Sequence, residues 1–174
     1  MAYREFVGLI HKSTPRDYLA RVTQRDKAEV ADLAVKFDYD YWDGGRDTGY
    51  GGYTYDGRWR KVADAMVAAY GIEPGMRILD VGSGKGFLLH DFRESVPGVE
   101  VAGIDVSEYA IDHTMKSVKP FCRTGSAEKL PWPDNHFDLV ISINTLHNLF
   151  MPDLWSSLKE IERVGRGARY LCVE

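Results

Sequence analysis

The chain has 174 residues, of which 44% are hydrophobic and 28% are charged, and its formal net charge is −4. This length supports one domain with a real core and is short for two. The acidic balance disfavours a nucleic-acid backbone as the main partner. The N-terminus lacks a long apolar segment, so we expect neither a signal peptide nor a membrane span, and a cytoplasmic location.

The first 36 residues have the pattern of amphipathic helices. Thr14, which stands before Pro15, is a plausible helix start. The following apolar residues recur at helix-like spacings with charges between them: Leu19, Val22, Val30, Leu33 and Val35.

Residues 37–59 have a different composition, because tyrosines and tryptophans alternate with glycines and aspartates. Neither a helical nor a strand period is sustained through this segment. Large rings need a surface to pack against, so we predict an irregular but ordered segment. Its rings are Tyr39, Tyr41, Trp42, Tyr50, Tyr53, Tyr55 and Trp59.

The rest of the chain alternates between predicted helices and strands. A helix at 59–70 should end at Gly71. Strands are predicted at 76–82, 99–107, 121–127, 137–144 and 168–174, and helices at 87–96, 108–118 and 152–164. Such alternation with short connections predicts an α/β, Rossmann-like fold with a mostly parallel sheet and helices on both faces.

A glycine-rich turn, residues 82–86, follows the first predicted strand, and three cofactor classes use such a turn. A P-loop needs Ser or Thr after its lysine, but Lys85 is followed by Gly86. A dinucleotide fingerprint needs GxGxxG, whereas the glycines here are spaced GxGxG, and Asp80 would repel a pyrophosphate. S-adenosylmethionine carries a sulfonium and an ammonium, which a carboxylate at this position favours.

A second acidic residue, Asp105, ends the apolar run of the second predicted strand. A carboxylate there can accept hydrogen bonds from both hydroxyls of a ribose. The same residue would suit NAD, so it does not discriminate between the two cofactors. Ser107 already provides an N-cap for the helix that follows, so Asp105 is not needed in that role.

Four segments together resemble the successive motifs of class I S-adenosylmethionine-dependent methyltransferases, in particular the small-molecule, methyltransferase type 11-like branch. They are ILDVGSGKGFLL, VAGIDVSEYAI, GSAEKLPWPDNHFDLVISINTLHNL and LKEIERVGRGARYLCVE. The resemblance covers residues 75–174, with the motifs in the expected order and at the expected distances.

The resemblance implies a role for each motif. The glycine turn would hold the methionine portion of S-adenosylmethionine, the segments after the second and third strands would hold ribose and adenine, and the end of the fourth strand would lie near the methyl group. The cofactor-binding residues implied are Asp80, Gly82, Ser83, Gly84, Gly86, Asp105, Val106, Ala127, Glu128 and Asn144. His147 is a candidate catalytic base, with His113, His136 or a tyrosine as alternatives. We interpret Trp132 as a loop anchor and Trp155 as a core residue.

Residues 1–70 would form a helical and aromatic lid over a cofactor-binding domain at 71–174. Within the lid, Tyr50, Tyr53 and Arg58 are candidate substrate contacts, and Arg46 is a further candidate for a carboxylate. The two cysteines, Cys122 and Cys172, are expected to be reduced and buried, and no metal site is expected.

The resembling family usually has seven strands, of which the last two are antiparallel. Those strands are expected to be absent from this chain, which stops at Glu174 after the fifth predicted strand. We therefore expect a missing C-terminal segment, a partner or a homo-oligomer to cover that edge of the sheet.

The predicted function is methyl transfer to a small-molecule acceptor. The alternative is a non-catalytic protein that binds S-adenosylmethionine or a partner; a nicotinamide-dependent oxidoreductase is disfavoured.

Overall fold

A computed structural model describes residues 4–10 and 27–173 of the chain. The predicted helix start at Thr14 and the apolar positions Leu19 and Val22 lie outside the described residues. Within those two ranges, no helix combines the length and the apolar character that crossing a membrane requires.

Five strands of the described chain form one sheet in the order β3-β2-β1-β4-β5, and each neighbouring pair is parallel. This confirms the predicted α/β, Rossmann-like class. The strand order reverses beside β1, so a crevice is expected outside the carboxyl ends of β1 and β4. The strands are β1 (Arg77–Val81), β2 (Glu100–Asp105), β3 (Cys122–Thr124), β4 (Phe137–Ile143) and β5 (Gly165–Cys172).

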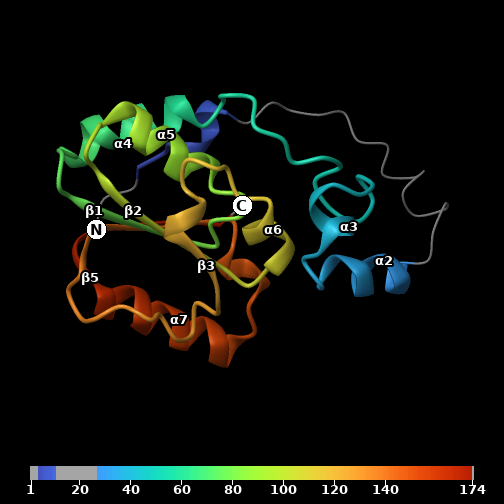
Figure 1. Ribbon diagram of the computed structural model, residues 1–174. Helices are drawn as coiled ribbons and strands as arrows, with labels where there is room; N and C mark the ends of the chain where they lie inside the picture. The colour runs from blue at the N-terminus through green and yellow to red at the C-terminus, as the bar shows by residue number, and fades with distance from the viewer. Residues whose placement is uncertain (1–3, 11–26, 174) are drawn as a thin grey trace.

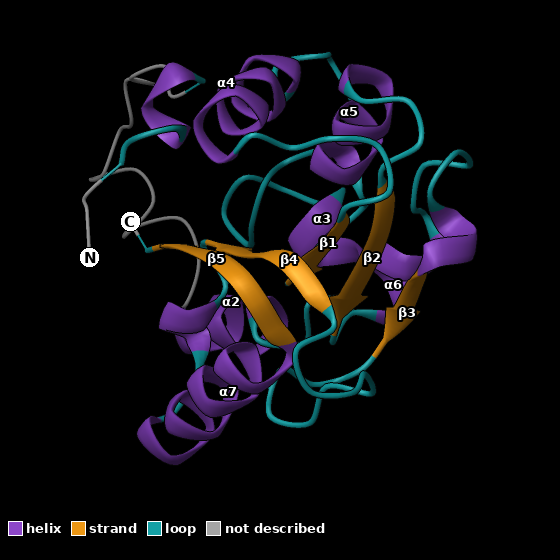
Figure 2. Cartoon of the chain, turned by 90° about the vertical axis from the view of Figure 1, so that its left-hand side faces the viewer, coloured by secondary structure: helices purple, strands orange, loops and turns teal. Residues whose placement is uncertain are grey.

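Helices cover both faces of this sheet, as Figures 1 and 2 show: α4 and α5 lie on one face and α7 on the other. The short helices α2 and α3 precede α4 in the chain. The α-helices are α2 (Lys27–Ala34), α3 (Tyr39–Trp42), α4 (Arg60–Tyr70), α5 (Phe87–Ser95), α6 (Glu108–Asp112) and α7 (Met151–Val164). The 3-10 helices are η1 (Val7–Leu9), η2 (Lys119–Phe121) and η3 (Leu146–Asn148).

The central strand β1 sends alternate side chains into two separate cores. Ile78 belongs to the core under α4 and α5, whereas Leu79 and Val81 belong to the core under α7. Successive strand residues point to opposite faces, so Asp80 shares the side of Ile78. The sequence therefore places one carboxylate on an otherwise apolar face, at the end of the strand next to the glycine turn.

Several elements differ from their predicted extents. Strand β3 is limited to Cys122–Thr124, and β5 begins at Gly165, three residues before its predicted start. Helix α6 was expected to run to residue 118 but ends at Asp112. The chain then turns back to the glycine turn, where Met115 N donates a hydrogen bond to Lys85 O at 3.0 Å. The segment 37–59 is largely irregular, as predicted, but it contains the single turn α3, whose N-cap Asp38 accepts from Tyr39 N at 2.8 Å.

Strand β5 lies at one edge of the sheet, and what covers that edge stays a prediction, as does the domain division at residues 70 and 71. The prediction that Trp155 belongs to the core is wrong. Its ring is 62% exposed on the outer side of α7, with the ammonium of Lys159 5.4 Å from the ring centroid. Four residues separate the two positions, which places them on the same face of a helix.

Candidate functional site

The turn after β1 needs glycine at three positions. Gly82, Gly84 and Gly86 have φ values of 85°, 51° and 73°, in the left-handed region. The amides of Gly82 and Ser83 both donate to Ile104 O, at 2.8 and 3.1 Å. The turn is thus tied to the end of β2, and its remaining backbone faces the carboxyl ends of the strands.

Asp105 fastens the same turn through its carboxylate. One oxygen accepts from Gly84 N at 2.7 Å and the other from Ser107 N at 2.9 Å. Burial raises the pKa of Asp105, and these backbone donors partly offset the rise. Each carboxylate oxygen can accept more than one hydrogen bond, so capacity remains for a ligand hydroxyl. Ser107 is the N-cap of α6, as predicted, and accepts from Ala110 N at 2.9 Å.

Asp80 is buried, being 6% exposed, and lies at the wall of a cavity. Among the described residues, none donates a hydrogen bond to its carboxylate. Burial, with a smaller contribution from the negative charge of Asp105, raises the pKa of Asp80 to about 7. A buried carboxylate without a donor is costly, and a cation bound in the cavity would remove that cost.

Two cavities adjoin the glycine turn at the carboxyl ends of the strands. The first has a volume of about 270 Å³ and is reached by Asp80, Ser83 and Gly84. The second, of about 100 Å³, is reached by Asp105 and Val106. Five residues line both cavities: Trp42, Tyr50, Gly82, Ile143 and Asn144. The two cavities are therefore neighbouring compartments of one site.

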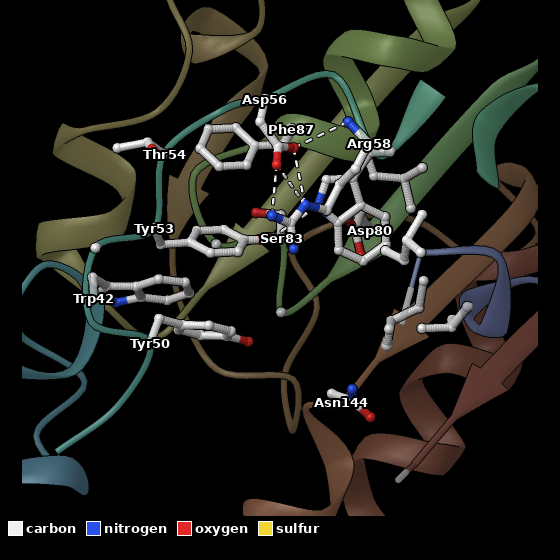
Figure 3. Close-up of a pocket in the computed structure, with 18 of the residues that line it drawn as sticks. Trp42, Tyr50, Tyr53, Thr54, Asp56, Arg58, Asp80, Ser83, Phe87 and Asn144 are labelled. Atoms are coloured by element: carbon white, nitrogen blue, oxygen red, sulfur yellow. Dashed lines mark hydrogen bonds and ion pairs between the residues drawn. The ribbon is translucent and has the colours of Figure 1, made fainter. Parts of the chain in front are cut away.

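Aromatic side chains from segment 37–59 form one wall of this site (Figure 3). The rings of Trp42 and Tyr50 are stacked, with centroids 5.4 Å apart and an interplanar angle of 14°. Tyr53 stacks on Phe87 of α5 at 4.8 Å. A Cβ on Gly84 would lie 2.8 Å from the Trp42 ring, so segment 37–59 packs directly on the glycine turn.

Polar contacts hold segment 37–59 against the glycine turn, and the sequence did not predict these contacts. The Trp42 indole nitrogen donates to Ser107 Oγ and to Phe37 O, both at 3.0 Å. The Lys85 ammonium lies 2.7 Å from each carboxylate oxygen of Asp43. One signal was present in the sequence. A lysine that is buried in a turn and binds no phosphate needs a carboxylate partner, and segment 37–59 contains several aspartates.

The predicted substrate contacts Tyr50, Tyr53 and Arg58 all line the larger cavity, and so does Arg46. The guanidinium of Arg58 already forms an ion pair with Asp56, with an Nε–Oδ2 distance of 2.8 Å, drawn as dashed lines in Figure 3. Because Asp56 already compensates the charge of Arg58, this residue is a weaker candidate for binding the carboxylate of a ligand.

Several predicted residues lie elsewhere. Gly86, Ala127, Glu128 and His147 are not among the described residues that line the two cavities. Glu128 is exposed and accepts from Ser126 Oγ at 3.0 Å, and His147 is exposed in η3. Trp132 anchors its loop as predicted, with its ring 5.3 Å from that of Phe137.

The two other candidate histidines are also absent from the described linings. The His113 ring stacks on Tyr109 at 3.9 Å, and the His136 ring lies 4.8 Å from that of Phe137. Burial raises the pKa of Tyr50 and of Tyr53 well above the ordinary value, so both hydroxyls stay protonated near neutral pH. These hydroxyls can orient a ligand but are poor proton acceptors.

Comparison with known proteins assigns a family to this arrangement. A family model described as "Methyltransferase domain" matches residues 79–172. A demethylmenaquinone methyltransferase of Symbiobacterium thermophilum is 35% identical over 127 residues, 68% of this chain and 50% of that protein. The ubiquinone/menaquinone biosynthesis C-methyltransferase UbiE of Cupriavidus necator is 34% identical over 116 residues, 62% of this chain and 46% of that protein.

A solved structure shares the fold. The SAM-dependent methyltransferase of Aquifex aeolicus is 28% identical with a TM-score of 0.50, and the match covers 59% of this chain and 57% of that one. The chain spans about half the length of the curated relatives that it matches.

Proposed function

Because this chain belongs to the methyltransferase-domain family, we propose that it transfers a methyl group from S-adenosylmethionine to a small-molecule acceptor. The observation that carries the proposal is the buried carboxylate of Asp80, which has no donor among the described residues and faces the larger cavity. An anionic wall of this kind suits a ligand that carries an ammonium and a sulfonium, and it disfavours a pyrophosphate.

The residues around both cavities fit this cofactor. Asp80 and the backbone from Gly82 to Gly84 would hold the methionine portion, because that turn leaves its backbone open to close approach. Asp105 and Val106 in the smaller cavity would hold the adenosine portion. Asn144, with a φ of 52° at the end of β4, lines both compartments and so lies where the two portions would meet.

When bound, S-adenosylmethionine supplies an electrophilic methyl carbon with sulfur as the leaving group. The chain's own contribution is then alignment and exclusion of water. The rings of Trp42, Tyr50 and Tyr53 line the larger cavity beside the glycine turn, where they would shield a bound ligand from solvent. Because the tyrosine hydroxyls in this wall stay protonated, we propose an acceptor that is already a good nucleophile when it binds.

The larger cavity is lined by the apolar side chains of Val7, Ile10 and Trp59 and also by charged ones, Arg46, Asp56 and Arg58. This mixed lining favours a flat acceptor with an apolar ring and polar substituents. One relative is named a demethylmenaquinone methyltransferase and another a ubiquinone/menaquinone biosynthesis C-methyltransferase, so we propose quinols and related phenols as the first class to test. A cytoplasmic location is part of the proposal.

Two measurements test the proposal. Isothermal titration should give micromolar or tighter binding of S-adenosylhomocysteine and no binding of NAD, and the Asp80→Asn variant should bind more weakly. Transfer of radiolabelled methyl to a panel of 1,4-naphthoquinol, catechols, amines and thiols should then identify the acceptor. Absence of S-adenosylhomocysteine binding to the folded chain would refute the assignment. Binding without transfer to any panel member would favour the non-catalytic alternative.

A further inference from the structure

Lys85 is a charged side chain that neither cofactor binding nor methyl transfer explains. It stands between Gly84 and Gly86 and is 5% exposed. It is not among the described residues that line either cavity. A buried ammonium needs a charged partner, and its Nζ lies 2.7 Å from both carboxylate oxygens of Asp43 in the lid.

This ion pair holds the backbone of Tyr53 on both sides. Lys85 Nζ donates to Tyr53 O at 3.0 Å, and Tyr53 N donates both to Asp43 Oδ1 at 3.1 Å and to Trp42 O at 2.9 Å. The main chain of Tyr53 is therefore fixed against the glycine turn, although 32 residues separate it from Lys85.

The Tyr53 ring extends from this fixed backbone into the wall of the larger cavity. It stacks on Phe87, with 23° between the ring planes, and its hydroxyl accepts from the Trp59 indole nitrogen at 3.1 Å. The position of this wall thus depends on the Lys85–Asp43 pair. Tyr109 reinforces the pair by donating its hydroxyl to Asp43 Oδ2 at 2.8 Å.

We propose that Lys85 is a positioning residue for the methyl acceptor. Through Asp43 and the main chain of Tyr53 it sets the aromatic wall of the larger cavity, without contacting the acceptor or the cofactor. The inference rests on the proposed function, because it assigns the wall to acceptor binding. Its structural part, that Lys85 holds Tyr53, concerns the ligand-free chain.

The inference separates the two ligands of the proposed reaction. The carbonyl of Trp42 accepts from Tyr53 N, but its indole, which lines the smaller cavity, has its own anchors at Ser107 and Phe37. The adenosine side should therefore keep its shape without Lys85. Loss of Lys85 should therefore raise KM for the acceptor by about tenfold or more, since small misplacements in a reacting pair are expensive. The dissociation constant for S-adenosylhomocysteine should change by less than about threefold.

Hydrogen exchange of the ligand-free chain tests the structural part. In Lys85→Met, exchange at the amide of Tyr53 should be about threefold faster or more, because Asp43 loses its counter-charge and the amide keeps only its 2.9 Å hydrogen bond to Trp42 O. Lys116→Met, which changes an exposed lysine, is the matched control and should exchange as wild type does. Asp43→Asn removes the same charge pair from the other side and should shift exchange in the same direction.

The kinetic part uses 1,4-naphthoquinol or the panel compound that the wild type methylates fastest. A raised KM in Lys85→Met with a nearly unchanged dissociation constant for S-adenosylhomocysteine would support the positioning role. Wild-type exchange at Tyr53 together with an unchanged KM would overturn it. Failure of both Lys85→Met and Asp43→Asn to fold would also overturn it, by making the pair a requirement for folding.

Failure of the proposed function would look different. The wild-type chain would then bind no S-adenosylhomocysteine or methylate nothing, while the exchange experiment would still decide whether Lys85 holds Tyr53.

Discussion

Gly82 and Thr145 are packed so closely that a Cβ on Gly82 would lie 2.6 Å from the Cβ of Thr145. The residues after β1 and after β4 therefore fit together only because the first has no side chain. Glycine is therefore required at position 82 for two reasons. Its φ of 85° lies in the left-handed region, and a larger side chain would clash with Thr145.

Gly82→Ala should destabilise the chain more than Gly57→Ala. Both positions have a left-handed φ, of 85° and 76°, so both variants bear about 1–2 kcal/mol of backbone cost. A Cβ on Gly57 meets no atom within 4 Å, whereas one on Gly82 meets Thr145, and overpacking costs about 1–3 kcal/mol more. Urea denaturation should measure this difference. Equal free energies of unfolding for the two variants would contradict the packing argument.

The raised pKa of Asp80 makes ligand affinity depend on pH. Below about pH 7 the carboxylate of the free chain is protonated, and a cationic ligand binds well only after that proton leaves. The affinity for S-adenosylhomocysteine, which carries an ammonium, should therefore rise as pH increases from about 6 to 8 and then level off. The change should approach tenfold per pH unit below the pKa. Calorimetry at several pH values measures it.

In the ligand-free chain, Asp80 should make the free energy of unfolding fall as pH rises, whereas ligand affinity rises with pH. Because the folded-state pKa of Asp80 lies above its value in the unfolded chain, the folded chain holds the extra proton between about pH 4 and pH 7. This contribution to stability is lost as pH rises through that window. Asp80→Asn should remove both dependences, and a pH-dependent affinity that survives in this variant would point to another group.

Removal of the Asp43 carboxylate should destabilise the fold. Burial alone would raise the pKa of Asp43, but hydrogen bonds from Lys85, Tyr109 and the Tyr53 amide lower it below the ordinary value. In Asp43→Ala the Lys85 ammonium stays buried without its partner, which costs about 3 kcal/mol. For a domain of this size the melting temperature should fall by about 6–12 °C. Glu73→Ala, at an exposed acid, should melt within about 2 °C of wild type.

His147→Ala should retain methyl transfer within about twofold of wild type. The side chain is exposed in η3 and does not reach the described linings of the two cavities. A general base contributes about 10²–10⁴-fold when it acts. The rate of radiolabelled transfer at saturating acceptor decides the matter, and a loss of a hundredfold would restore His147 as a candidate base.

The sheet and the glycine turn could be predicted because their signals are local. Apolar runs such as residues 77–81 end in glycines, and the order of such elements defines the fold class. The helix after β2 was predicted too long, since the segment from Met115 onward packs against the glycine turn instead of continuing a helix. That contact joins residues far apart in the sequence, and hydrophobic periodicity carries no information about such contacts.

The site was predicted in part for the same reason. Asp80 and Asp105 lie at the carboxyl ends of the neighbouring strands β1 and β2, so topology alone brings them together. The lid could be identified by composition, but its attachment depends on Asp43 meeting Lys85, 42 residues away. Nothing in the spacing of either residue indicates the other. Trp155 was misplaced because a large ring in a helix was taken as core, whereas a single exposed ring is common on protein surfaces.

The buried indole of Trp42 gives the chain an intrinsic optical probe. It is 6% exposed and lies against the turn and both compartments, whereas Trp155 is largely in water. Its fluorescence should therefore be blue-shifted from that of Trp155, and comparison with Trp42→Phe separates it from the contributions of Trp59 and Trp132. Stopped-flow mixing could then time the arrival of a nucleoside at the turn without any attached dye, and a Trp42→Phe chain would supply the blank.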